Sequence, residues 1–246
     1  MFFHEKTYDI DELVRYNTHI HTHFSGCARP EMQVNDIVKT AEEAGLKLIA
    51  LTDHDTADKP NIVADFRKQI LSELKESKVK VLVGAELSCC GIGKFVNDIS
   101  CDSQMDYKLY TMNHFHVRFW DQPEDKTPRG FAVQMLKMAE SVVDLRQADC
   151  FAHPFHAGYI HNFDDPHEVT RAYKDNELGD IMEKANNKQI AWELNTGAVM
   201  SDPEFYHRYF QIGKEVGCVF NIGTDAHRLC AVDSTQFAER LKEILY

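Results

Sequence analysis

Six short motifs rich in His, Asp and Glu are spread along the chain, and several directly follow an apolar run. They are His19-Ile20-His21, Thr52-Asp53-His54-Asp55, Gly84-Ala85-Glu86, Asn113-His114, Ala152-His153-Pro154 and Asp225-Ala226-His227. Residues two apart on a β-strand point to the same side, so a pair such as His19 and His21 can aim both imidazoles at one spot. This pattern predicts one metal site assembled from the ends of many strands.

The segments between the motifs alternate apolar strands with amphipathic helices. We expect strands over residues 16–21, 46–52, 79–85, 107–120, 150–152, 190–195 and 219–223. Helices are expected over 35–44, 61–77, 131–146, 203–217 and 235–245. Asn35 is the predicted N-cap of the first helix, and Pro203 takes the favoured first position of another. Residues 88–106 are predicted to be loop and residues 157–189 an excursion with later helix, and either could form a lid over the site.

This alternation predicts a parallel sheet, because a helix must carry the chain back between parallel strands. Seven units fit a closed barrel better than an open doubly wound sheet, and no glycine-rich nucleotide motif is present. In α/β barrels the functional groups lie at the C-terminal ends of the strands, where the six motifs fall. No repeat, linker or low-complexity segment divides residues 1–246, which we expect to form a single domain.

Composition limits the partners of the chain. Its 246 residues carry a net charge of −12, which argues against binding to nucleic-acid backbones but is compatible with small phosphorylated substrates. No apolar stretch is long enough for a membrane helix, and the N-terminus lacks the features of a signal peptide. Seven cysteines at irregular spacings are typical of reduced thiols in a cytoplasmic protein.

The order and spacing of the motifs HIH, TDHD, GAE, NHFH, AHP and TDAH resemble the polymerase and histidinol phosphatase (PHP) superfamily of metal-dependent phosphoesterases. The stretch Glu193-Leu194-Asn195-Thr196 is similar to the histidinol-phosphatase branch. The resemblance implies a distorted seven-stranded TIM-like (β/α)7 barrel. It also implies two or three divalent cations, zinc, manganese or iron, and hydrolysis of a phosphate ester by a metal-bridging hydroxide.

The resemblance further implies a ligand set. The first metal would be held by His19, His21, Glu86 and Asp225. Glu86 would bridge to a second metal completed by His114 and His153, whereas His54 and His227 would serve a third. A set of imidazoles and carboxylates suits Zn²⁺, Fe or Mn²⁺ better than Ca²⁺. A water on the third metal, or His227 if that site is empty, would act as general acid.

One departure from the family pattern concerns the third metal. Where many relatives have Asp or His, this chain has Gly26 and Cys27. Cys27 could bind as a thiolate and favour zinc, or it could be a small residue beside a weak site. His23 is a nearby alternative, because on a regular strand it would share the face of His19 and His21. Strand geometry would also place His116 beside His114, and we favour His114 as the ligand.

Other side chains are candidates for substrate contact or for support. Arg228 directly follows the last motif, and Arg29 and Arg118 follow two others; each could bind phosphate or form a surface ion pair. His156 could reach the substrate or lie on the surface. The remaining candidates are expected to orient ligands and loops or to contact substrate: Asp53, Asp55, Glu193 and Asn195.

The favoured function is hydrolysis of a small phosphomonoester such as histidinol phosphate or a nucleotide. A 3′–5′ exonuclease or phosphodiesterase acting on a short oligonucleotide is the alternative, and it would need a basic groove. A non-catalytic metal-binding regulatory domain is a third possibility, supported only by Gly26 and Cys27. An amidohydrolase also begins with His-x-His, but Glu86 at the bridging position and the final Asp225-Ala226-His227 favour phosphoester chemistry.

Overall fold

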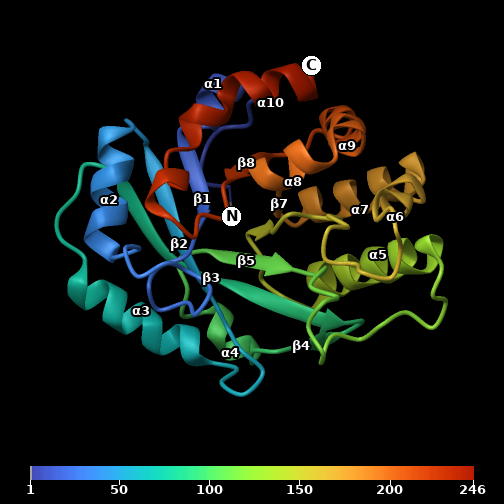
Figure 1. Ribbon diagram of the computed structural model, residues 1–246, viewed down its shortest axis with the longest axis horizontal. Helices are drawn as coiled ribbons and strands as arrows, with labels where there is room; N and C mark the ends of the chain where they lie inside the picture. Colours follow the sequence, from blue (N-terminus) through green and yellow to red (C-terminus); the bar gives the residue numbers. More distant parts are fainter. Residues whose placement is uncertain (1) are drawn as a thin grey trace.

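Seven parallel strands form a closed ring in the computed structural model, which describes residues 2–246 (Figure 1). They are β1 (Tyr16–Ile20), β2 (Leu48–His54), β3 (Lys80–Gly91), β5 (Lys108–Thr111), β6 (Cys150–Phe151), β7 (Ala191–Asn195) and β8 (Phe220–Gly223). The hydrogen-bonded order is β2-β1-β8-β7-β6-β5-β3, and an additional pairing of β2 with β3 closes the ring. The predicted seven-stranded barrel is therefore confirmed.

Helices surround the ring and return the chain from one strand to the next (Figure 1). The longer ones are α2 (Val34–Glu43), α3 (Ile62–Glu73), α5 (Pro128–Leu145), α7 (Asp175–Asn187), α9 (Pro203–Glu215) and α10 (Ala238–Leu245). Short helical segments are α1 (Ile10–Leu13), α4 (Ile99–Asp102), α6 (His167–Arg171), α8 (Thr196–Ser201), η1 (Leu229–Ala231) and η2 (Ser234–Phe237). Among the described residues, no helix is both long and apolar enough to cross a bilayer.

Local sequence explains where several helices begin and end. The Asp202 side chain accepts from the Phe205 amide at the start of α9, and Pro203 occupies the first turn as predicted. Gly45 and Gly217 follow α2 and α9 with φ of 70° and 76°, a conformation that glycine adopts without steric cost. The predicted N-cap at Asn35 is wrong, because α2 begins at Val34. The side-chain NH₂ group of Asn35 donates to the Glu73 carbonyl of α3 instead.

One strand prediction and one loop prediction are wrong in extent. The segment 107–120 contains only the short β5, because the chain turns away at Asn113. The side-chain NH₂ group of Asn113 donates to the backbone carbonyls of His153 and His156, each at 3.0 Å. Residues 88–106 are not simply loop. β3 continues to Gly91 and pairs antiparallel with β4 (Lys94–Phe95), and α4 follows.

Alternation along the strands separates the barrel interior from its outer layer. On β2, Ile49 and Leu51 pack in the apolar cluster that contains α2, whereas Leu48 and Ala50 join a separate cluster built from the facing strands. His54 follows Leu48 and Ala50 at even spacing, so it emerges on the interior side at the C-terminal end of β2. Glu86 is its register partner on β3. The strands therefore deliver polar side chains to one end of the barrel.

Candidate metal centre

Glu86 lies at the centre of the polar side chains at this end of the barrel, and its side chain is fully buried. Its Oε2 is 3.1 Å from His54 Nδ1 and 3.2 Å from His19 Nε2. Its Oε1 is 3.1 Å from His153 Nε2 and 3.8 Å from His114 Nε2. The two carboxylate oxygens therefore face two different groups of imidazoles.

The first group contains His19, His21, Glu86 and Asp225. The Nε2 atoms of His19 and His21 are 3.2 Å apart, and both face Asp225 Oδ1, at 3.3 and 2.9 Å. Asp225 adopts a φ of 51°, which is unusual for a residue with a Cβ atom. Such strain persists only where the surroundings enforce it, and it is common at functional sites.

The second group contains Glu86, His114 and His153. His153 also has a positive φ, 28°, directly before Pro154. His114 lies beyond the end of β5, in the turn that Asn113 fixes, so the strand argument that paired it with His116 does not apply. His114 nevertheless belongs to this group, whereas His116 lies at the exposed edge and belongs to none of the groups found within residues 2–246.

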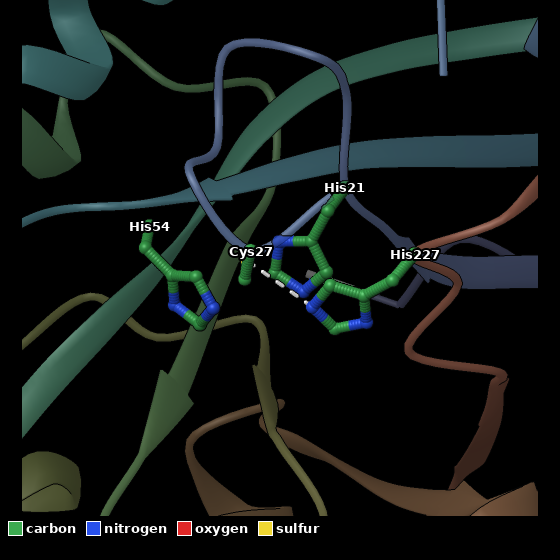
Figure 2. A group of neighbouring side chains, drawn as sticks. All are labelled: His21, Cys27, His54 and His227. Atoms are coloured by element: carbon green, nitrogen blue, oxygen red, sulfur yellow. Dashed lines mark hydrogen bonds between the residues drawn. The ribbon is translucent and has the colours of Figure 1, made fainter. Parts of the chain in front are cut away.

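The third group contains His21, Cys27, His54 and His227, whose candidate ligand atoms all lie within 4.8 Å of one another. Figure 2 shows the four side chains converging from three separate segments, with the Cys27 thiol directed at His227. Cys27 Sγ is 3.2 Å from His227 Nε2, and His227 Nδ1 donates to the Asp225 carbonyl at 2.7 Å. That second contact leaves the lone pair of Nε2 directed toward Cys27. His23 is not part of the group.

The electrostatics of the three groups fit cations. Burial lowers the pKa of His54 to about 4 and that of His114 well below its usual range, so both imidazoles are neutral and keep a lone pair at pH 7. Although burial opposes it, neighbouring imidazoles hold the pKa of Glu86 and that of Asp225 well below their usual ranges. Burial, reinforced by Glu86, raises the pKa of the Cys27 thiol to about 11.

The donor set itself tests whether divalent metals suit the site. The Nε2 atoms of His19 and His21 converge to 3.2 Å beside the carboxylates of Glu86 and Asp225, whose pKa values lie well below their usual ranges, so one cation could share all four donors. Mixed imidazole and carboxylate donors are typical of Zn²⁺, Mn²⁺ and Fe sites. The residues therefore fit divalent cations.

Glu193 supports two of the groups at once, and its side chain is fully buried. Its Oε1 accepts from His19 Nδ1 at 2.8 Å, and its Oε2 accepts from the backbone N–H of His153. A Cβ atom on Gly223 would collide with the same carboxylate, so only glycine fits at this point of β8. The sequence marked Glu193 as a contact at the active end but gave no sign that it links two ligands.

Asp53 holds the loop that carries Cys27. Its carboxylate accepts from the Thr22 amide at 2.7 Å and from the hydroxyls of Thr22 and Ser25, each at 2.6 Å. The expectation that Asp53 orients a loop is thereby confirmed. Asn195 has a local role, because its side chain accepts from the Ala198 amide and caps α8.

A cavity of about 720 Å³ opens above the metal centre. Each of the three groups contributes some of its candidate ligands to the floor of this cavity, among them Cys27, His54 and Glu86. The three arginines considered for phosphate binding are exposed, and none of them lines this cavity: Arg29, Arg118 and Arg228. His156 is likewise absent from its lining.

Fold and site together define the class of the protein as a parallel barrel with candidate metal ligands at the C-terminal ends of its strands, where α/β-barrel enzymes have their active sites. Residues 17–197 match the PHP domain family, and the chain belongs to this family. It is 26% identical over 220 residues to a probable histidinol-phosphatase of Thermotoga maritima, covering 85% of this chain and 82% of that protein. A crystal structure of histidinol phosphate phosphatase from Lactococcus lactis, complexed with zinc, L-histidinol and phosphate, has the same fold. That likeness has a TM-score of 0.59 at 17% identity and covers 92% of each chain.

Proposed function

We propose that the protein hydrolyses a small phosphomonoester, of which histidinol phosphate and a nucleotide are the two leading examples. The observation that carries this proposal is the position of Glu86, whose two oxygens face two separate groups of imidazoles. A carboxylate placed between two candidate cation sites suits a two-metal centre, in which the cations would stabilise the attacking and leaving oxygens of an in-line displacement. The two histidinol phosphatases named above support the same reaction.

In this proposal each group of side chains holds one cation. The first is held by His19, His21, Glu86 and Asp225, and the second by Glu86, His114 and His153. Cys27, His54 and His227 hold the third, with His21 beside them. Bound divalent cations activate water for attack and neutralise the oxygens of the phosphoryl group.

The chain's own residues would complete the reaction. Glu193 keeps the proton of His19 on Nδ1 and so leaves Nε2 free to bind. His54 and His227 line the cavity. Where the third cation is absent, His227 would have to carry a proton on Nε2 as well as on Nδ1 in order to protonate the leaving oxygen. Because Arg228 lies outside the cavity lining, the cations and not this arginine would neutralise the negative charge of the phosphoryl group.

A phosphodiesterase acting on nucleic acid is the second candidate, and no observation within residues 2–246 favours it. The cavity has the volume of a site for a small molecule. The net charge of −12 opposes binding of a polyanion.

The test is phosphate release by protein that has been stripped of metal and reloaded with Mn²⁺ or Zn²⁺. The substrates are histidinol phosphate, a nucleoside 3′,5′-bisphosphate, sugar phosphates and a short oligonucleotide. We expect metal-dependent release from a monoester. Cleavage of the oligonucleotide alone would place the protein among the nucleases. The absence of phosphate release from every substrate would contradict the proposal.

Two variants locate the reaction at this site. His19→Ala and Asp225→Ala should lose bound metal and nearly all turnover while remaining folded, because each removes a donor from the first group. Lys137→Ala, on the outer helix α5, is the control that should behave as wild type. Full turnover in either site variant would contradict the assignment of the ligands.

A further inference from the structure

Beyond the candidate ligands, the wall of the cavity is largely aromatic. Its large side chains are Phe24, Phe66, Val117, Phe119, Trp120 and Tyr159. The rings of Phe24 and Phe66 stack with centroids 5.5 Å apart, which joins the loop after β1 to α3. Phe119, in the turn after β5, is 43% exposed. The aromatic side chains together form an apolar patch in a concave site, and such a patch marks a ligand-binding surface where a single exposed side chain would not.

Apart from imidazoles, the same wall carries two carboxyl groups and no cationic side chain of residues 2–246. Asp55 and Asp58 line the cavity, whereas no Lys or Arg of residues 2–246 does so. Asp55 is buried and accepts from the Ser88 hydroxyl at 2.9 Å through Oδ1, while its Oδ2 has no hydrogen-bond partner in the described structure. Asp58 is exposed. Positive charge in the cavity would therefore come only from bound cations on its floor and from protonated imidazoles.

This distribution of charge restricts the part of the substrate that leaves as the alcohol. The cations neutralise the phosphoryl group, but a second anionic group would have to lie against the aromatic wall or beside Asp58. It would lose its hydration there without gaining a cation, which is costly. A like charge placed opposite it also suppresses binding. A ring or an ammonium group would meet no such penalty.

We infer that the substrate is a phosphomonoester whose alcohol carries an apolar or aromatic group and no anionic group. This inference rests on the proposed function and narrows it. It disfavours nucleoside bisphosphates and phosphorylated acids within the wider class of phosphomonoesters. It also names Asp58 as the residue that sets this preference from the cavity wall, away from the candidate ligands.

Three aryl phosphates that differ only in the para substituent test the inference on the metal-loaded enzyme. They are 4-methylphenyl, 4-(aminomethyl)phenyl and 4-carboxyphenyl phosphate, which are neutral, cationic and anionic at the ring. We expect kcat/KM for the carboxylate to be about tenfold or more lower than kcat/KM for the methyl compound. The kcat/KM for the ammonium compound should equal or exceed that for the methyl compound. The carboxylate makes the phenol a better leaving group, so slower turnover would reflect binding. Equal turnover of the carboxylate would overturn the inference.

Asp58→Lys tests the role of the wall. We expect it to raise the ratio of kcat/KM for 4-carboxyphenyl phosphate to kcat/KM for the methyl compound about tenfold. Arg228→Ala is the control for the exposed arginines. If its loss selectively removes turnover of the carboxylate, a cation at the mouth serves anionic substrates and the inference fails.

Binding separates failure of the inference from failure of the proposed function. Benzylphosphonate and 4-carboxybenzylphosphonate cannot be hydrolysed, so calorimetry with the metal-loaded protein ranks them without turnover. Weaker binding of the carboxylate by about tenfold supports the inference even if no phosphate ester is cleaved. Equal affinities overturn it whether or not the protein is a phosphatase.

Discussion

Two buried glutamates organise the metal centre in different ways. Glu86 directs its oxygens at imidazoles of separate groups, so it is placed to bind cations on both sides. Glu193 instead contacts the far side of His19 and the backbone of His153. A carboxylate behind a histidine fixes which nitrogen carries the proton and so which one is free to bind.

Glu193→Gln should weaken metal binding by about 10- to 100-fold with the fold intact. Glutamine can still accept from the His153 amide, but its NH₂ group would then face His19 Nδ1. That contact forces the proton of His19 onto Nε2, the nitrogen directed at the metal centre. Competition with a chromophoric chelator measures the affinity, and Glu140→Gln on the surface of α5 is the matched control. Equal zinc affinities in all three proteins would contradict this role.

Cys27 should lose its proton when zinc fills the third group. Burial, reinforced by Glu86, raises the pKa of the thiol to about 11, so the metal-free protein holds a protonated Cys27 at pH 8. Binding as thiolate must then release that proton. We expect Cys27→Ser to release about one proton fewer per chain on zinc addition in a weakly buffered solution. Cys230→Ser, at a cysteine outside the three groups, should match wild type, and identical release in all proteins would exclude Cys27 as a ligand.

At the scale of the element, the register between neighbouring strands places candidate ligands from different strands at the same end of the barrel. The parallel register pairs His54 with Glu86 across β2 and β3. This register depends on how closely the backbone of β3 can approach the segment before β5. A Cβ on Gly84, two residues before Glu86, would collide with the Tyr107 carbonyl oxygen, which accepts from the Ala85 amide at 3.0 Å.

Gly84→Ala should therefore lower the free energy of unfolding and also weaken metal binding, because β3 must move away from the segment before β5. We expect a loss of about 1–3 kcal/mol, the usual cost of overpacking a filled interior. Gly179→Ala on α7 is the matched control, since its Cβ would meet only ordinary contacts at 3.8 and 3.9 Å. Urea unfolding and zinc titration measure both effects, and unchanged zinc affinity in a destabilised Gly84→Ala would contradict the link between β3 and Glu86.

At the scale of the whole molecule, the metal centre joins segments from both ends of the chain. His21 lies 2.9 Å from Asp225, and the backbone N–H of His21 donates to the Ala226 carbonyl at 3.0 Å. Cations bound at this point would hold the first and last strands of the ring together, so metal and global stability should be coupled.

Removal of metal should therefore lower the unfolding midpoint. A ligand that binds only the folded state at 100 times its Kd adds about 2.7 kcal/mol. For a chain of this length that corresponds to roughly 5–10 °C. Calorimetry of chelator-treated protein, repeated with increasing Zn²⁺ or Mn²⁺, measures the shift. A midpoint that does not depend on added metal would show that the groups do not bind it in the folded state.

The sequence alone determined the architecture and the membership of the first two groups of side chains. For the third group it left Cys27 open as a ligand and did not include His21. Apolar runs of strand length separated by helical periodicity encode a parallel barrel, because side-chain alternation and helix periodicity are local properties. The position of most of the His, Asp and Glu side chains at strand ends followed from the same local pattern, but that of His114 did not, because β5 ends at Thr111. The motifs that resembled the PHP superfamily then supplied the grouping of residues such as Glu86, His114 and His153.

Only the tertiary structure decided features that depend on contacts between distant segments. β5 ends early because Asn113 binds backbone carbonyls about 40 residues away, at His153 and His156. Glu193 reaches His19 across 174 residues, and Arg228 lies outside the cavity although it follows a candidate ligand. A one-dimensional pattern shows which residues share a face of one strand. It contains no information on how loops from different strands turn, and those turns set which side chains meet above the barrel.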